Sequence, residues 1–240
     1  MRHYGIIGNP LEHSFSPAFF TQLFEQKSID ADYTKLPLLY LDDIKTLDID
    51  GFNVTYPYKT DIIPFLDELD DTAVKIGAVN TVKRIKTGKG YILKGYNTDC
   101  TGFEHAIEPL IKGKDIQALI LGTGGAAKAV AYAFEENAIP YTFVSRNKKN
   151  GMTYNSLNKE IISDHKLIVQ ATPLGMYPKT SSAPDIPYEY LTKDHIAFDC
   201  IYNPPETLFL KKAKQAGATT ENGLNMLICQ ARAAWQIWNQ

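Results

Sequence analysis

Short apolar runs and helix-like patterns alternate along the first hundred residues of the chain. Segments with helical spacing fall at 17–26 and 61–69, and strand patterns lie around them at 4–7, 32–39, 51–55, 78–85 and 91–95. The last two strand patterns flank a glycine-containing turn, which predicts a hairpin. This alternation of strands and helices is typical of an α/β domain.

The middle of the chain begins with a continuous apolar run at 115–121, the pattern of a strand buried on both faces. A glycine-rich turn, an alanine-rich helical segment at 128–137 and a second strand at 141–145 follow it. Together these segments predict one βαβ unit of about thirty residues. Later patterns predict strands at 167–171 and 196–199 and helices at 207–215 and 224–238.

The composition is that of an ordinary globular protein and narrows the function classes. The 240 residues are 44% apolar and 22% charged, which excludes a disordered chain, a collagen and a coiled coil. The net charge of −2 lacks the basic excess of a nucleic-acid or membrane-surface binder. Cys100, Cys200 and Cys229 are far apart and form no CxxC pair. We therefore expect neither a bound metal nor disulfides, but reduced thiols in a cytoplasmic protein without a signal peptide or membrane span.

A glycine-rich turn links the buried strand to the alanine-rich helix. Residues 122–127 fit the pattern G-x-G-x-x-A. In this pattern the first glycine allows a tight turn, the second lets the backbone approach a pyrophosphate, and the last small residue lets helix and strand pack closely. Phosphates then sit at the helix N-terminus, where N–H groups and the helix dipole favour anions. The context of strand, turn and helix predicts a dinucleotide site, and the alternative is a turn that serves packing alone.

The end of the second strand of this unit distinguishes the two nicotinamide dinucleotides. An NAD site usually has an acidic residue there, on the ribose 2′-hydroxyl. This chain has no carboxylate at that point but the run Ser145-Arg146-Asn147-Lys148-Lys149. The planar guanidinium of Arg146 can hold a 2′-phosphate, with Lys148 or Lys149 adding charge. The sequence therefore favours NADP(H), and the alternative is a solvated basic loop.

Four clusters of polar residues lie at strand ends or in adjoining turns of the first region, at 9–17, 53–59, 77–81 and 95–102. Each cluster alone is typical of a turn or a helix cap. Open α/β sheets bind their ligands at the ends of strands, so the common position of the clusters indicates a ligand site.

These clusters resemble the sequence pattern of the shikimate dehydrogenase family. The family motifs N-P-x-x-H-S-x-S-P, N-V-T-x-P-x-K, G-A-V-N-T and G-x-N-T-D-x-x-G match the four clusters in order, and the glycine turn matches as well. Three further blocks follow, A-T-P-x-G-M at 171–176, D-x-x-Y-x-P-x-x-T at 199–207 and G-x-x-M-L-x-x-Q at 223–230. The eight blocks cover nearly the whole chain, and Gln170 stands where the family usually has Asn.

The resemblance implies an α/β fold of two domains and an activity. The implied domains are an N-terminal α/β substrate domain of residues 1–98 plus 224–240 and a Rossmann-like, doubly wound NADP-binding domain of residues 99–223. The implied activity is the reversible NADPH-dependent reduction of 3-dehydroshikimate to shikimate, a step of aromatic amino-acid (chorismate) biosynthesis. The implied partners are this small-molecule substrate and NADP(H), with no nucleic acid and no membrane, in a monomer or homodimer.

The resemblance also assigns roles to individual residues, with Lys59 as the catalytic acid/base paired with Asp99. The chemistry agrees, because hydride delivery to a ketone builds an alkoxide that a lysine ammonium can stabilise and protonate. The alternative for this pair is a plain ion pair. The implied substrate-binding residues are Ser14, Ser16, Thr55, Asn80, Tyr202 and Gln230. The implied cofactor-binding residues are Gly122, Thr123, Gly124, Gly125, Ala126, Ser145, Arg146, Asn147, Lys148, Asp71 and Gly223.

Three other hypotheses stay open on the sequence. The first is a quinate/shikimate dehydrogenase that uses NAD, and Arg146 argues against it. The second is a protein of this family that binds the ligands without turnover, and the intact Lys59 and Asp99 argue against it. The third is a Rossmann reductase for another small acid, which would leave the matches at the substrate positions without a reason.

Overall fold

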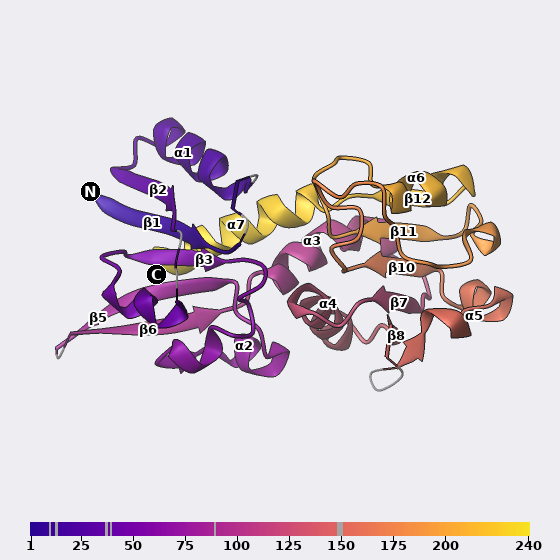
Figure 1. Ribbon diagram of the computed structural model, residues 1–240, viewed down its shortest axis with the longest axis horizontal. Helices are drawn as coiled ribbons and strands as arrows, with labels where there is room; N and C mark the ends of the chain where they lie inside the picture. The colour runs from indigo at the N-terminus through magenta and orange to yellow at the C-terminus, as the bar shows by residue number, and fades with distance from the viewer. Residues whose placement is uncertain (10, 13, 37, 39, 89, 148–150) are drawn as a thin grey trace. The chain divides into compact units, whose positions relative to one another are not determined.

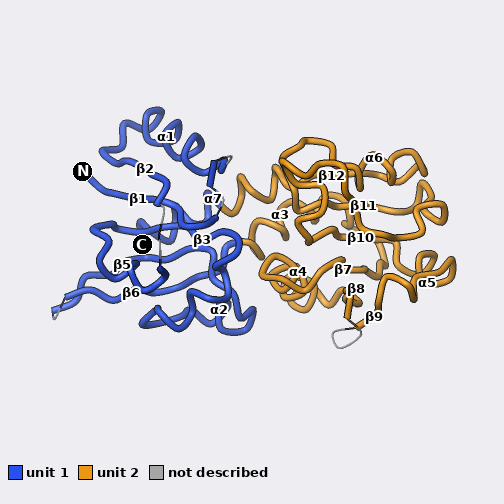
Figure 2. The backbone as a smooth tube through the Cα atoms, in the orientation of Figure 1, with its two compact units in different colours: residues 1–98, 231–240 blue, residues 99–230 orange. Residues whose placement is uncertain are grey.

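The computed structural model describes residues 1–9, 11–12, 14–36, 38, 40–88, 90–147 and 151–240. The chain divides into two compact units (Figure 2). Unit 1 holds residues 1–98 and 231–240, and unit 2 holds residues 99–230. Each unit is built on its own sheet, and the predicted α/β class is confirmed.

Unit 1 contains a mixed six-stranded sheet with the strand order β2-β1-β3-β5-β6-β4 (Figure 1). Strand β1 pairs in parallel with β2 and β3, whereas β5 is antiparallel to both β3 and β6. The antiparallel pair β5 and β6 is the predicted hairpin. The strands are β1 (Arg2–Ile7), β2 (Ala31–Lys35), β3 (Gly51–Val54), β4 (Glu68–Leu69), β5 (Thr81–Thr87) and β6 (Gly90–Tyr96).

Side chains of a strand alternate between its two faces, and in unit 1 each face of the sheet packs in its own hydrophobic cluster. On one face Tyr4 stacks on Trp238, with ring centroids 4.7 Å apart. This face carries helix α1 (Ser16–Gln26) and the C-terminal part of α7 (Leu224–Trp238). Gly51 makes the contact with α7 close, because a Cβ there would lie 2.5 Å from the Trp238 indole nitrogen. The other face of the sheet packs in a separate hydrophobic cluster around Phe52.

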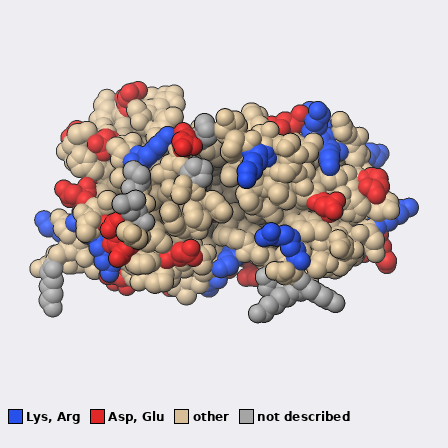
Figure 3. All heavy atoms as spheres, viewed as in Figure 1, with Lys and Arg blue, Asp and Glu red and all other residues tan. Residues whose placement is uncertain are grey.

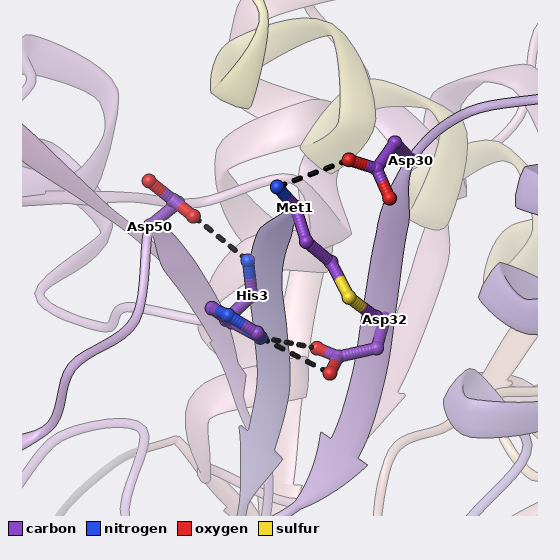
Figure 4. Close-up of polar contacts among 5 residues, drawn as sticks. All are labelled: Met1, His3, Asp30, Asp32 and Asp50. Carbon is purple, nitrogen blue, oxygen red and sulfur yellow. Dashed lines mark hydrogen bonds and ion pairs between the residues drawn. The ribbon is translucent and has the colours of Figure 1, made fainter.

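The start of β1 is held by polar contacts on the surface (Figure 4). His3 and Asp32 are register partners on β1 and β2, and His3 Nδ1 lies 3.0 and 3.1 Å from the two carboxylate oxygens. The His3 N–H donates to Asp50 at 2.8 Å, and the amino group of Met1 pairs with Asp30 at 3.0 Å. Exposed ion pairs of this kind each contribute about 0–1 kcal/mol to stability, so they position the end of the strand and add little to the stability of the fold.

The prediction of a helix at 61–69 is wrong. The segment forms turns, a short 3₁₀ helix at Ile63–Phe65 and the strand β4. Pro64 explains the failure, because it has no N–H to donate to a continuing α-helix. The α-helix of this region is α2 (Asp71–Ile76), which the apolar pattern missed. Its local signals were present, since Asp70 caps the N-terminus and Gly77 ends the helix with φ of 65°.

Unit 2 contains a six-stranded sheet with the order β12-β11-β10-β7-β8-β9, in which every pairing is parallel. From β7 the chain adds β8 and β9 on one side of the sheet, and then β10, β11 and β12 on the other side. This is the doubly wound order of dinucleotide-binding folds, and it places the switch point between β7 and β10. The strands are β7 (Ala118–Leu121), β8 (Tyr141–Ser145), β9 (Met152–Thr153), β10 (Leu167–Gln170), β11 (Ile196–Asp199) and β12 (Thr219–Glu221).

Strand β7 lies in the apolar run 115–121, and its predicted burial on both faces is confirmed. Ala118 and Ile120 of β7 join the cluster under α3 and α4, and Leu119 and Leu121 join the cluster on the opposite face. The helices of unit 2 are α3 (Asp99–Ile111), α4 (Gly125–Glu136), α5 (Lys159–Asp164) and α6 (Leu208–Gln215), with the first residues of α7.

Two differences from the sequence predictions concern helices of unit 2. Helix α3 was not predicted, although Phe103, Ala106, Ile107 and Leu110 repeat at helical spacing. The predicted first domain includes all of 224–240, whereas the compact units divide α7 after Gln230. The predicted domain boundaries therefore stay a prediction that folding experiments on the separate parts would test.

Neither sign of charge dominates the face of the molecule drawn in Figure 3. On the face drawn in Figure 3, acidic and basic side chains are interspersed. Within the described residues, no helix is long and apolar enough to cross a membrane, and no group of three or more His, Cys, Asp or Glu side chains is arranged to hold a metal ion.

Candidate active site

A buried network of polar side chains lies at the strand ends of unit 1. The Asn80 side-chain oxygen accepts hydrogen bonds from the Thr98 N–H at 2.7 Å and from the Thr81 hydroxyl at 3.1 Å. The Asn80 amide nitrogen donates to the Thr98 hydroxyl at 3.0 Å. Asn53 of β3 donates to the Asn80 carbonyl and to the Thr81 hydroxyl, each at 3.2 Å. These hydrogen bonds fix the orientation of the Asn80 amide, because a backbone N–H can only donate.

The two serines of the first polar cluster lie at the start of α1. Ser16 begins the helix and is 5% exposed, and Ser14 precedes it and is half-buried. Thr55 follows β3 and is half-buried, and its N–H donates to the Ile7 carbonyl at 2.9 Å. Gly8 permits this approach of the two strand ends, since a Cβ there would lie 2.3 Å from Thr55 Cγ2.

Lys59 lies in the turn that follows β3 and is half-buried. Its carbonyl accepts a hydrogen bond from the Val79 N–H at 2.7 Å, so the turn is attached to the residue next to Asn80. Asp99 is 5% exposed and begins α3 as the first residue of unit 2. Lys59 belongs to unit 1 and Asp99 to unit 2, so their pairing stays a prediction.

Helices α3 and α7 make a close contact inside unit 2. A Cβ on Gly102 would lie 2.4 Å from the Met226 carbonyl oxygen and 2.9 Å from Gln230 Cβ. The glycine therefore places Gln230, which is 7% exposed, beside the first turn of the helix that Asp99 begins. The structure thus brings together two regions that were predicted to form the site, Gln230 on α7 and the start of α3.

The glycine turn has the geometry that a bound dinucleotide requires. Gly122 has φ of 113°, and a Cβ there would lie 3.0 Å from the Ala171 carbonyl oxygen. Gly124 precedes α4, and a Cβ there would meet nothing within 4 Å, so the space in front of the helix is open. Helix α4 begins at Gly125, and the N–H groups of its first turn have no partner inside the helix. The residues present thus fit a pyrophosphate at this N-terminus, next to Thr123 and Ala126.

The basic loop follows β8, as predicted. Ser145 ends the strand, and its hydroxyl donates to the Asn147 carbonyl at 2.6 Å while accepting from the Asn147 N–H at 3.2 Å. The tight turn leaves Arg146 exposed. Lys148, the next predicted cofactor residue, lies outside the described residues.

The remaining two predicted cofactor residues lie apart from this turn. Asp71 is exposed in the first turn of α2 in unit 1, so its assignment to the cofactor stays a prediction. Gly223 is buried in unit 2, and its N–H donates to the Ile201 carbonyl at 3.0 Å. A Cβ on Gly223 would lie 2.3 Å from the Cys200 carbonyl oxygen, so the glycine allows contact with the loop that carries Tyr202.

Comparisons with known proteins identify the family of the chain. A family model described as the shikimate dehydrogenase substrate binding domain matches residues 6–82. A shikimate dehydrogenase (NADP(+)) from Methanosphaera stadtmanae is 39% identical over an alignment of 258 residues that covers 98% of this chain and 90% of the relative. The chain belongs to the shikimate dehydrogenase family.

Solved structures of shikimate dehydrogenases have the same fold. The enzyme from Aquifex aeolicus gives a TM-score of 0.87 at 36% identity, covering 100% of this chain and 92% of that one. The enzyme from Thermus thermophilus, in complex with NADP(H) and shikimate, gives 0.86 at 29% identity, covering 99% and 93%.

Gln170 shows how this member of the shikimate dehydrogenase family departs from the usual Asn. The side chain is fully buried at the end of β10. Its oxygen accepts from the Thr172 N–H at 2.9 Å and the Thr172 hydroxyl at 2.7 Å, and its nitrogen donates to the Leu174 carbonyl at 2.9 Å. Residues 171 and 172 pack against Gly122, so Gln170 supports one side of the glycine turn.

Two buried polar residues received no role from the sequence, although Asp199 opens the matched block at 199–207. Tyr33 donates to Asn53 at 2.7 Å, and the Thr207 hydroxyl donates to Asp199 at 2.6 Å. The signal for Asp199 was this block, together with its place as the acidic residue that closes the otherwise apolar strand 196–199. No comparable signal marked Tyr33, since tyrosine is common in strands.

Proposed function

We propose that this chain catalyses the reversible NADPH-dependent reduction of 3-dehydroshikimate to shikimate. The observation that carries the proposal is the 39% identity to a shikimate dehydrogenase (NADP(+)) over 98% of the chain. The geometry supports it from both units, with a buried amide network around Asn80 in one and an open glycine turn before α4 in the other.

Lys59 is proposed as the acid/base of the reaction. NADPH, when bound, supplies the hydride to the carbonyl carbon of the substrate. The carbonyl oxygen then needs a proton, which the Lys59 ammonium donates, and in the reverse direction neutral Lys59 accepts the hydroxyl proton. Asp99 is proposed to orient the lysine and to bind the substrate hydroxyl, in keeping with its buried position at the start of α3.

The substrate carboxylate and hydroxyls are proposed to bind neutral polar groups. The hydroxyls of Ser14 and Ser16 donate to the carboxylate. Amide side chains suit hydroxyl recognition, because each offers a donor and an acceptor. The remaining proposed substrate residues are Thr55, Asn80, Tyr202 and Gln230.

Residues 122–126 are proposed to hold the pyrophosphate of NADP(H), and Arg146 its 2′-phosphate. The open space at Gly124 and the exposed position of Arg146 support this assignment. Ser145 and Asn147 contribute by forming the turn that presents the arginine. Lys148, Asp71 and Gly223 complete the proposed cofactor set.

A steady-state assay with four substrate pairs tests the proposal. Shikimate and quinate are each combined with NADP⁺ and NAD⁺, and the formation of reduced nicotinamide is followed by absorbance. We expect the highest kcat/KM for shikimate with NADP⁺. A preference for quinate or for NAD⁺ would favour a quinate/shikimate dehydrogenase, and no turnover with any pair would favour a ligand-binding protein. A cytoplasmic location and a monomeric or homodimeric state stay predictions, which fractionation and sedimentation would test.

A further inference from the structure

We propose that Asp199 positions Tyr202 for substrate binding by holding both ends of the loop 200–207. The inference rests on the proposed function, which gives Tyr202 a contact with the substrate. The loop connects β11 to α6, and Tyr202 lies half-buried in it. Asp199 itself is fully buried, so it acts through the loop rather than on the substrate.

One carboxylate joins the two ends of this loop. Asp199 Oδ1 accepts from the Ile201 N–H at 2.9 Å, and Oδ2 accepts from the Thr207 hydroxyl at 2.6 Å. Thr207 is 1% exposed and is also the N-cap of α6, where its side chain accepts from the Leu210 N–H at 3.3 Å. The end of β11, the loop and the following helix are therefore connected through a single side chain.

The backbone on either side of Tyr202 is attached to neighbouring segments. The Cys200 N–H donates to the Gln170 carbonyl at 2.9 Å, and the Ile201 carbonyl accepts from the Gly223 N–H at 3.0 Å. The Asn203 carbonyl accepts from the Tyr177 N–H at 3.1 Å. With both neighbours of Tyr202 attached, the loop that Asp199 closes fixes the backbone position from which the Tyr202 side chain extends.

The choice of an acid at this position has a cost that packing alone would not require. A buried carboxylate loses its hydration, which is costly when the group is ionised. The two hydrogen bonds to Asp199 are directional, and the bond from the Thr207 hydroxyl is short, at 2.6 Å. An apolar residue would fill the same space without selecting one loop conformation. The buried carboxylate, hydrogen-bonded to both ends of the loop, therefore indicates that the loop conformation matters to the site.

The Thr207 hydroxyl allows a direct test. Thr207→Val keeps the shape of the side chain and removes the hydrogen bond to Asp199, and Thr207→Ser keeps that bond. We expect Thr207→Val to raise the KM for shikimate about fivefold to twentyfold, with the KM for NADP⁺ unchanged within about twofold. Thr207→Ser is expected to stay close to the wild type. Asn158→Ala is the matched control, because Asn158 caps α5 in the same unit with a 2.9 Å bond to the Ile161 N–H.

Tyr202→Phe separates a failure of this inference from a failure of the proposed function. If Tyr202→Phe leaves the KM for shikimate unchanged, the substrate role of Tyr202 is wrong and the inference falls with it. If Tyr202→Phe raises that KM but Thr207→Val does not, the inference alone is overturned. In the double variant Tyr202→Phe with Thr207→Val we expect a KM for shikimate no higher than in Tyr202→Phe alone. If the two effects on this KM multiply instead, the Asp199–Thr207 hydrogen bond acts independently of Tyr202, and the inference is overturned. Asp199→Asn replaces Thr207→Val if the latter does not fold, because its amide nitrogen cannot accept the Thr207 hydrogen.

Discussion

Tyr33 donates its hydroxyl hydrogen to the side-chain oxygen of Asn53 at 2.7 Å, inside unit 1. The tyrosine is 6% exposed, and its ring stacks on Phe20 with centroids 4.6 Å apart. Asn53 in turn donates to the Asn80 carbonyl. A residue of β2 thus supports the amide network at the proposed substrate site.

Tyr33→Phe is expected to destabilise the protein by about 1–3 kcal/mol, because the ring stays in place while the buried oxygen of Asn53 loses its donor. The free energy of unfolding in urea measures the effect. Tyr188→Phe is the control, since Tyr188 is half-buried and donates to the Pro184 carbonyl at 2.8 Å in unit 2. If Tyr33→Phe lowers the free energy of unfolding no more than the control does, the Tyr33–Asn53 hydrogen bond contributes no more to stability than the bond from Tyr188 to Pro184.

Stability is expected to depend on pH through Asp199. Burial raises the pKa of its carboxyl from the ordinary 3.8 to about 7, although hydrogen bonds from Thr207 and Ile201 lower it. Between these values the unfolded carboxyl is ionised while the folded one keeps its proton, so stability falls as the pH rises from about 4 to about 7 and is level above. The full difference is on the order of 4 kcal/mol.

The comparison of the wild type with Asp199→Asn isolates this group. Across that pH range, the free energy of unfolding of the wild type should fall relative to the variant. Tyr188, the titratable side chain that interacts with Asp199, stays neutral there because burial raises its pKa. A difference that is constant with pH, or that changes in the opposite direction, would contradict the raised pKa.

Lys59→Ala is expected to lower kcat by about 10²–10⁴, the range for removal of a positioned acid/base. Steady-state oxidation of shikimate with NADP⁺ measures it. Lys75→Ala serves as the control, because Lys75 is exposed on α2 in the same unit and has no proposed role. A kcat equal to that of the control would exclude Lys59 as the acid/base.

Arg146→Ala is expected to raise the KM for NADPH roughly tenfold or more while changing the KM for NADH much less, because only NADPH carries the 2′-phosphate. Arg232→Ala, which removes an exposed arginine of α7, is the control. Equal increases for both cofactors would show that Arg146 does not distinguish them.

Gly102→Ala is expected to cost about 1–3 kcal/mol of stability, because a methyl group 2.4 Å from the Met226 carbonyl must push α3 and α7 apart. The displacement of Gln230 should also raise the KM for shikimate. Gly88→Ala is the control, since a Cβ there meets nothing within 4 Å. An unchanged melting temperature would mean that the two helices separate without cost.

Local pattern predicted those elements whose signals are local. Strand β8 at 141–145, strand β11 at 196–199 and helix α7 at 224–238 coincide with the predicted bounds. The errors arose where apolar spacing and chain-breaking residues compete. Pro64 interrupts the pattern at 61–69, and the caps Asp70 and Gly77 define α2 with few apolar residues between them.

The sequence by itself determined the family and the glycine turn, and it supplied the residues of the proposed site, because these depend on motifs of neighbouring residues. Only the tertiary structure decided which distant groups meet. Asp199 and Thr207 are eight positions apart and Tyr33 and Asn53 twenty, and each pair forms one buried hydrogen bond. No sequence period specifies such pairs, because they depend on how strands and loops pack, and a buried polar group keeps its place only where that packing supplies a partner.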